Sequence, residues 1–198
     1  MKNLKTSALA LLIATLIAAV LPTDAEAKIY EDTLRLHILA ASNREEDQAL
    51  KYEIRDELLK KYGEIFAKSN SHNETKELAN ELLPEIESSV NEWIDERGFD
   101  YSATVTLTEE WYDTRVYESF TMPAGTYTSL RVIIGGGDGK NWWCVMYPPL
   151  CTELATESAP KDDALIDYSK EELFLIKSGK YNIKFKTLEI ISSTFRKK

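Results

Sequence analysis

The side chains whose types suit nucleophilic chemistry are the chain's two cysteines and two histidines. Cys144 or Cys151 could act as a nucleophile if His37 or His72 served as its base. His72 lies in a polar loop and is expected to be solvated. His37 is expected to be a hydrogen-bonded histidine on the face of a strand, with a base or a partner contact as the alternative. These positions favour structural roles over a catalytic pair.

The two cysteines enclose a short segment that contains Pro148-Pro149, which bends the chain back. A disulfide between Cys144 and Cys151 is geometrically possible if their Cα atoms come within about 7 Å, and it would leave no thiol for catalysis. Two buried free thiols are the alternative, because cysteine is among the most buried residue types. The sequence leaves both states open.

The spacing of potential ligands does not support metal or phosphate chemistry. No Cys-x2-Cys or His-x3-His pair occurs, so a metal site would consist mostly of carboxylates, and we expect no metal or other cofactor. The glycine-rich run 135–139 follows an expected strand, as phosphate-binding loops do. However, Ile134 occupies the place of the first Walker glycine, and Asn141 replaces the Ser or Thr after Lys140. A tight turn is the expected role of this run, with a ligand cradle as the alternative.

The run over residues 141–151 reads Asn-Trp-Trp-Cys-Val-Met-Tyr-Pro-Pro-Leu-Cys. Neighbouring residues of a strand point to opposite faces of the sheet, so Trp142 and Trp143 cannot fill the same core. Either the sheet is buried on both faces, or one indole is available to a partner, and tryptophan is a favoured anchor at interfaces.

Glycoside hydrolysis would need a pair of acids, which cannot be chosen among 33 Asp and Glu residues.

The composition describes a globular chain with an acidic balance. Its 198 residues are 43% hydrophobic and carry a net charge of -9. These values disfavour disorder, and they disfavour the cationic surface that nucleic-acid binding needs. Basic residues gather instead in the tail over 177–198. We expect this tail to be a solvated edge, with a weak contact to anionic membrane headgroups as the alternative.

The first 27 residues have the pattern of a secretory signal peptide. Lys2 and Lys5 precede an apolar run over residues 8–21, which is too short to span a bilayer comfortably. Ala25-Glu26-Ala27 follows as a cleavage motif. We expect cleavage between Ala27 and Lys28, with an uncleaved anchor as the alternative. Residues 28–198 would then form one domain outside the cytoplasmic membrane, with a core over 33–151 and a variable tail over 152–198.

Hydrophobic periodicity predicts an α+β fold. Alternation over 33–40 predicts a half-buried strand, and Ser42 with Glu45 fits a capping box before a helix over 44–66. A second helix is predicted over 74–97, kinked or divided at Pro84, with Gly98 as its stop. Strands are predicted at 101–107, 115–120, 127–134, 142–146 and 181–186, before a short amphipathic tail element. Two amphipathic helices would pack on a mainly antiparallel sheet that carries an aromatic and glycine-rich loop region.

Three blocks of the sequence resemble the stage II sporulation protein R family of endospore-forming Firmicutes. They are Arg-Leu-His-Ile-Leu-Ala-Ala-Ser-Asn at 35–43, Pro-Ala-Gly-x-Tyr at 123–127, and Asn-Trp-Trp-Cys-Val-x-Tyr-Pro-Pro-Leu-Cys at 141–151. The resemblance covers about residues 34–151 together with the signal peptide.

The resemblance implies a signalling protein rather than an enzyme. Members of the family are made in the forespore and secreted into the space between forespore and mother cell. There they activate a membrane-embedded, aspartic-type protease that processes the precursor of sigma factor E. We therefore expect this protease as the partner, and a secreted cell-wall or peptide hydrolase is the alternative function. The candidate partner contacts are Trp142, Trp143, Asn141, Tyr147, Pro148, Pro149, Arg131, Arg35 and His37.

Overall fold

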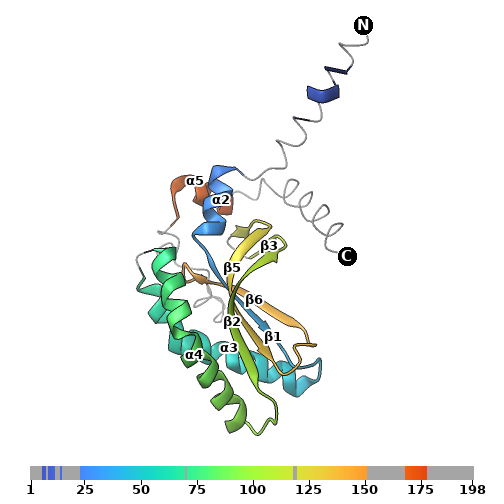
Figure 1. Ribbon diagram of the computed structural model, residues 1–198, viewed down its shortest axis with the longest axis vertical. Helices are drawn as coiled ribbons and strands as arrows, with labels where there is room; N and C mark the ends of the chain where they lie inside the picture. Colours follow the sequence, from blue (N-terminus) through green and yellow to red (C-terminus); the bar gives the residue numbers. More distant parts are fainter. Residues whose placement is uncertain are drawn as a thin grey trace.

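A computed structural model describes residues 23–69, 71–117, 120–150 and 168–177, together with residues 6, 7, 9–11 and 14. Its centre is a four-stranded sheet with the strand order β2-β5-β1-β6 (Figure 1). Helices α3 (Glu45–Ala67) and α4 (His72–Glu96) lie on one side of this sheet. The predicted α+β class, with two long helices on a mostly antiparallel sheet, is confirmed.

The strands of this sheet are joined by one parallel and two antiparallel pairings. Strand β1 (Leu34–Leu39) lies inside the sheet, parallel to β5 (Gly125–Ile134) and antiparallel to β6 (Asn141–Tyr147). The edge strand β2 (Ala103–Tyr112) pairs with β5 in a continuous antiparallel register. Between them, β3 (Arg115–Val116) and β4 (Thr121–Met122) form a separate short hairpin. Of the predicted strand over 115–120, Arg115–Val116 form a strand, whereas Tyr117 and Phe120 do not.

The main core lies between the sheet and its two helices. Leu36 and Ile38 of β1 belong to the same buried cluster as Leu58 of α3 and Val90 of α4. The predicted apolar stripe of α3 is buried as far as Tyr62, but Ile65 at its end is 36% exposed. Phe66 is fully buried instead, because a step of four residues from Tyr62 keeps a side chain on the same face of a helix.

The prediction that β1 is half-buried is wrong, because both of its faces are covered. Arg35 is fully buried and His37 is 8% exposed, although both stand on the polar phase of the strand. The face opposite the helices is covered by aromatic side chains from β2, β5 and β6 and from the β3–β4 hairpin. Period-two alternation therefore marks the two faces of this strand correctly but does not reveal that the polar face is enclosed.

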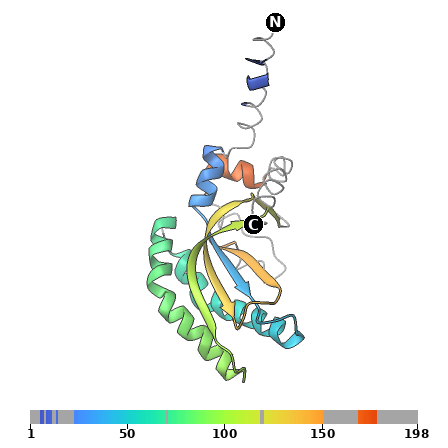
Figure 2. The same cartoon turned by 45° about the vertical axis from the view of Figure 1, so that its right-hand side comes forward.

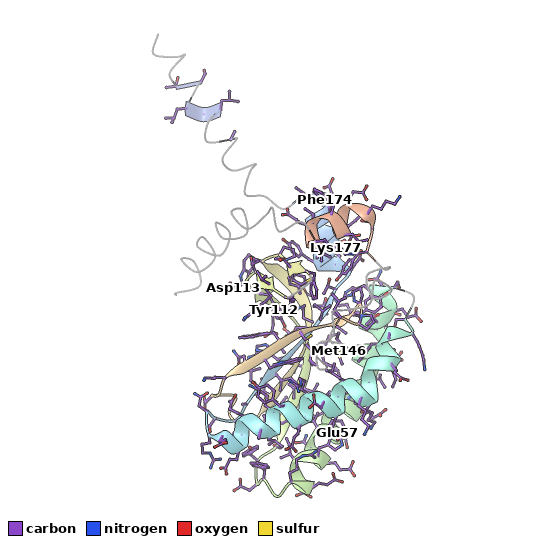
Figure 3. All side chains as sticks on the ribbon, turned by 180° about the vertical axis from the view of Figure 1, so that it is seen from behind. Glu57, Tyr112, Asp113, Met146, Phe174 and Lys177 are labelled. Carbon is purple, nitrogen blue, oxygen red and sulfur yellow. The ribbon has the colours of Figure 1, made fainter. Side chains whose placement is uncertain are left out.

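A second core lies at the other end of the sheet, where α2 (Asp24–Glu31) and α5 (Lys170–Lys177) pack together (Figure 2). Ile29 of α2 and Ile176 of α5 are buried there with Tyr127 of β5. Figure 3 shows Tyr112, at the end of β2, close to this helix pair. Helix α5 was not predicted, because it follows a long polar stretch that resembles a surface linker.

Two of the expected helix starts differ in the structure. The capping box of Ser42 with Glu45 is wrong, since α3 begins after Arg44 without a side-chain cap and the Ser42 hydroxyl donates to Asp47 instead. His72 is the first residue of α4 and is 8% exposed, so the expectation that it is solvated is also wrong. Helix α4 passes through Pro84 as one helix, and Gly98, with φ 77°, follows its C-cap as predicted.

Some predictions fall on parts of the chain that the structure does not describe. The strand at 181–186, the tail element and nearly all of the acidic stretch 152–170 lie outside the described residues. Where the structure describes the chain, it contains no helix of the length and apolar character that a membrane crossing requires.

Candidate functional site

The glycine-rich run 135–139 is a turn that docks against the connection between β1 and α3. Gly137 has φ 69°, a conformation that side chains rarely adopt. Gly139 donates its backbone N–H to the Ala40 carbonyl at 2.9 Å, and a Cβ atom on Gly139 would collide with the Ser42 carbonyl oxygen. These contacts favour the tight-turn role that the sequence predicts over a cradle for a ligand.

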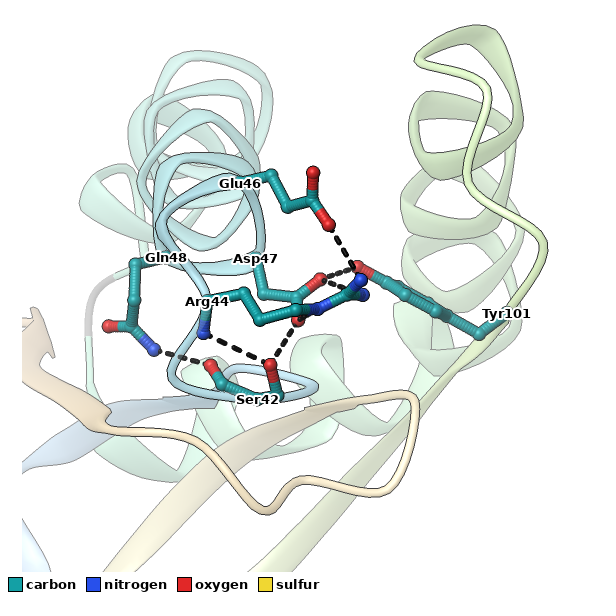
Figure 4. A network of polar contacts seen from close by, with 6 residues as sticks. All are labelled: Ser42, Arg44, Glu46, Asp47, Gln48 and Tyr101. Atoms are coloured by element: carbon teal, nitrogen blue, oxygen red, sulfur yellow. Dashed lines mark hydrogen bonds and ion pairs between the residues drawn. The ribbon is translucent and has the colours of Figure 1, made fainter.

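Asp47 is the buried centre of a polar network beside this turn (Figure 4). Its carboxylate accepts hydrogen bonds from Ser42 Oγ at 2.5 Å, Tyr101 Oη at 2.6 Å and Arg44 Nε at 3.1 Å. Burial on its own raises the pKa of the Asp47 carboxyl, but the three hydrogen bonds outweigh it and hold that pKa below its ordinary value. The network ties the start of α3 to the segment before β2.

The network predicts how stability depends on pH. A carboxyl whose folded pKa is depressed stabilises the fold above its unfolded pKa of about 3.9, and this stabilisation is lost as pH falls through the folded pKa. Asp47→Asn should therefore lower the free energy of unfolding at pH 7, and its difference from the unsubstituted chain should shrink below about pH 4. Urea unfolding at both pH values measures this difference. Asp56→Asn, on the exposed side of α3, is the matched control, and a difference that stays constant with pH would contradict the assignment.

On the sheet face opposite the helices, polar and aromatic side chains from five strands meet. They form what we call the outer-face cluster, namely His37, Glu110, Arg115, Arg131 and Trp143. The Glu110 carboxylate lies 3.0 Å from His37 Nδ1 and 3.4 Å from Arg131 Nε. The Trp143 ring stacks on His37 with centroids 5.4 Å apart, and the Arg115 guanidinium lies 4.1 Å from the Trp143 ring centroid.

The protonation of this cluster follows from its contacts. Burial on its own raises the pKa of Glu110, but the hydrogen bonds from His37 and Ser129, and then the charges of His37 and Arg131, outweigh it and lower that pKa. Glu110 is therefore an ionised acceptor, so His37 Nδ1 must donate to it. His37 Nε2 is buried and has no hydrogen-bond partner among the described residues. The cluster combines a ring surface with two guanidinium groups, a combination suited to contacts with aromatic or acidic groups of a partner.

Among the described residues, Arg35 is the largest fully buried side chain, and it lies beside this cluster. Its guanidinium carbon is 4.3 Å from the Tyr112 ring centroid and 5.1 Å from the Tyr127 ring centroid. Arg35 Nε donates to the Cys144 carbonyl at 3.1 Å, while Nη1 has no partner among the described residues. Aromatic faces thus surround the cation, and no carboxylate of the described residues pairs with it.

The predicted partner contacts divide between the surface and the interior. Asn141 is exposed, and Trp143, Arg131 and Pro149 are partly exposed. Tyr147, Pro148, Arg35 and His37 are buried, so a partner cannot reach them without a rearrangement. The two indoles point to opposite faces as predicted: Trp142 packs against the main core on the helix face, and Trp143 packs against the second core.

Three members of the outer-face cluster, His37, Arg131 and Trp143, were predicted as contacts, whereas Glu110 and Arg115 were missed. Glu110 is one of two adjacent acids, and the sequence does not show which of them is partly buried. Arg115 comes from a hairpin whose fold onto the sheet is set by tertiary packing. One signal could have placed Glu110 on the outer face. It stands on the polar phase of β2, where it pairs with Tyr127 of β5.

The structure also bears on the catalytic alternatives. Cys144 is disulfide-bonded, and Cys151, the chain's other cysteine, lies outside the described residues. A bonded Cys144 cannot serve as a nucleophile. Among the described residues, no group of three or more His, Cys, Asp or Glu side chains lies close enough to hold a metal ion.

Comparison with known proteins places the chain among proteins of sporulation. A family model described as stage II sporulation protein R matches residues 30–157. The chain therefore belongs to the stage II sporulation protein R family. In this chain the aromatic block begins on β6, and the glycine-rich block forms the turn before it.

A curated relative supports the same family. The stage II sporulation protein R of Bacillus subtilis (strain 168) is 33% identical to this chain over 145 residues. The match covers 73% of this chain and 65% of the relative, slightly less than two thirds of its length. The relative's name denotes a stage of sporulation and no enzymatic activity. No solved structure gave a significant match.

Proposed function

We propose that this chain is a secreted sporulation signal that activates a membrane-embedded, aspartic-type protease, which in turn processes the precursor of sigma factor E. The observation that carries the proposal is membership of the stage II sporulation protein R family. Disulfide-bonded Cys144 agrees with it, because disulfides persist in oxidising compartments outside the cytoplasm. The chain would work by binding rather than by chemistry of its own.

The N-terminal pattern supports an extracytoplasmic location. A basic start, a short apolar run and Ala25-Glu26-Ala27 are the parts of a secretory leader. In this proposal the leader directs the chain across the forespore membrane into the intermembrane space. The protease is then reached from outside the mother cell, where a diffusing protein can contact only its exposed surface.

Activation requires a difference in binding. A ligand shifts an equilibrium only if it binds the active state of the protease, or its active dimer, more tightly than the inactive state. The outer-face cluster is the contact surface that we propose, since Trp143 and Arg131 are partly exposed there. Exposed Asn141 stands at the start of the same strand as Trp143.

The proposal predicts that Trp143→Ala abolishes activation, whereas Trp142→Ala does not. Both indoles are partly exposed, so both substitutions remove similar packing, but they lie on opposite faces of β6. The chain, the protease and the sigma factor precursor are co-expressed in a non-sporulating host, and precursor cleavage is scored by immunoblot. We expect at least a tenfold loss with Trp143→Ala and less than a twofold loss with Trp142→Ala, at matched levels of folded protein.

The same assay contains the results that would reject each part of the proposal. If the unsubstituted chain does not raise precursor cleavage, the function itself is wrong. If cleavage rises but both tryptophan variants retain it, the function stands and the outer-face cluster is not the contact surface. If the precursor is cleaved when the chain is co-expressed with it and the protease is omitted, the chain is an enzyme and not an activator.

A further inference from the structure

The free edge of the sheet is covered by helix α4 along only half of its length. Strand β2 is an edge strand, and α4 runs beside it (Figure 2). At the first half of β2, side chains of α4 occupy the outward main-chain groups. Asn91 accepts from the Ala103 N–H at 2.7 Å and donates to the Ala103 carbonyl at 3.0 Å, and Glu87 accepts from the Val105 N–H at 2.8 Å.

The second half of β2 has the same outward groups without such partners. Outward and inward main-chain groups alternate along an edge strand, and the register between β2 and β5 continues without a bulge. Leu107 and Glu109 therefore face outward like Ala103 and Val105. In the part of the chain that the structure describes, no side chain or main-chain group bonds to the outward N–H and carbonyl groups of Leu107 and Glu109.

A groove lies along this uncovered half. It has a volume of about 470 Å³ and lies between α4 residues Lys76 and Glu77 and the edge residues Leu107 and Glu109. An uncovered edge beside a groove is the geometry in which an extended peptide adds a strand to a sheet. Natural sheets usually cover or charge such edges. Here the side chains of α4 cover the main-chain groups of only the first half of β2.

A polar pocket continues from the groove. Its volume is about 290 Å³, and it shares Lys76, Glu109 and Thr128 with the groove. His72 lines the pocket, is 8% exposed, and has a buried Nδ1 without a hydrogen-bond partner among the described residues. Burial and the neighbouring charge of Lys76 lower the pKa of His72, which keeps the ring neutral and able to accept a hydrogen bond.

The charge of the pocket identifies what it would accept. Glu31, Asp32 and Glu109 line it, against one cation, Lys76. Lys76 pairs with Glu109 at 3.2 Å, so Glu31 and Asp32 carry the uncompensated negative charge among the lining residues. Burial, and then the nearby charges of Glu172 and Glu31, raise the pKa of Asp32 despite the opposing charge of Lys28. An arriving cation with hydrogen-bond donors would relieve the repulsion among these acids. A small rotation of the His72 ring would bring its buried Nδ1 within reach of the same donors.

We infer that the uncovered half of β2 binds an extended segment of another protein as an added strand, with an arginine side chain of that segment seated in the His72 pocket. The main chain of the segment would pair with Leu107 and Glu109. The guanidinium would face Asp32, Glu109 and His72. This surface is separate from the outer-face cluster, so the inference does not depend on the proposed function.

The test uses the 15N-labelled full chain and a blocked ten-residue probe of alternating Thr and Val with one central Arg. We expect binding with amide shift changes centred on Leu107 and Glu109. A second probe of the same charge, N-methylated at alternate amides on the pairing side, should bind at least tenfold more weakly. A third probe with Gln in place of Arg should also bind at least tenfold more weakly.

Matched variants of the chain complete the experiment. Glu109→Lys should weaken binding of the Arg probe at least tenfold, whereas Glu81→Lys, the same change on an exposed part of α4 that does not line either cavity, should weaken it less than twofold. His72→Phe keeps an aromatic ring without the acceptor and should abolish the preference for Arg over Gln.

Equal binding of the N-methylated probe would show attraction by net charge alone and overturn the inference. Shifts at other sites would overturn it as well. The inference would also be overturned if the full chain did not bind the probe and a chain lacking residues 178–198 did. The tail of the chain itself would then be the occupant of the edge.

Discussion

Arg35→Ala should lower the free energy of unfolding by about 2–5 kcal/mol, the range for large buried side chains replaced by alanine. The side chain is fully buried against Tyr112 and Tyr127, so its removal leaves a cavity, and the Cys144 carbonyl loses a donor. Relief of a buried positive charge offsets part of this loss. Urea unfolding monitored by tyrosine and tryptophan fluorescence measures the change.

Arg35→Met separates packing from charge at the same position. Methionine retains most of the volume but carries no charge, and apolar replacement of buried ionic groups is often neutral or stabilising. We therefore expect a loss below about 1.5 kcal/mol. If Arg35→Met were as destabilising as Arg35→Ala, the guanidinium would have an essential partner beyond the tyrosine rings. If Arg35→Met folds normally but fails to activate the protease, the cation is retained for function.

Gly139→Ala should lower the free energy of unfolding by about 2–3 kcal/mol, because the new Cβ would overlap the main chain of Ser42. The contact is with a backbone carbonyl rather than with the end of a flexible side chain, so the turn itself must move. That movement would break the bond from the Gly139 N–H to the Ala40 carbonyl. Thermal and urea unfolding both report the loss.

Gly136→Ala is the matched control in the same turn. Its Cβ would meet Asp138 Oδ2, the end of a side chain that can rotate away, and its φ is not in the positive range. We expect a change below about 0.5 kcal/mol, as for substitutions away from buried features. If both alanine variants were equally tolerated, the docked turn would not contribute to stability, and the glycine run would need another explanation.

Much of the fold could be predicted from the sequence because its elements have clear periodicity. Helices α3 and α4 and strands β1, β5 and β6 lie close to their predicted ranges, whereas β2, predicted over 101–107, continues to Tyr112. Helix α5 could not be predicted, because its eight residues depend on packing against α2 and on burial of Leu175 and Ile176. The start of α3 was mispredicted because Ser42 bonds to Asp47, a tertiary choice that a local capping pattern does not reveal.

The candidate site was predicted in composition but not in exposure. The sequence indicated that Trp142 and Trp143 point to opposite faces, and this feature holds. Of the other candidate contacts, His37 stacks on Trp143, and Arg131 and His37 share Glu110 as a partner. It did not indicate that Arg35, His37 and Tyr147 are buried, because burial of a polar phase depends on the hairpin over 115–122. The groove beside Leu107 was invisible for a similar reason, since it exists only where α4 stops covering β2.

Helix α2 has a consequence for the order of events in the life of the chain. The bond between Ala27 and Lys28, where we expect the leader to be removed, lies within this helix, and Glu26 beside it is fully buried. Proteases act on opened rather than folded segments. If the leader is removed there, as we propose, processing would come before α2 forms, while the chain is still emerging from the membrane. The leader would then take the capping residues Thr23 and Glu26 with it. The new amino terminus would be held by Ile29 and by the Tyr30 hydroxyl, which donates to the Ala124 carbonyl. Maturation would thus remodel one end of the molecule, and the precursor and the mature protein would not share the same surface there.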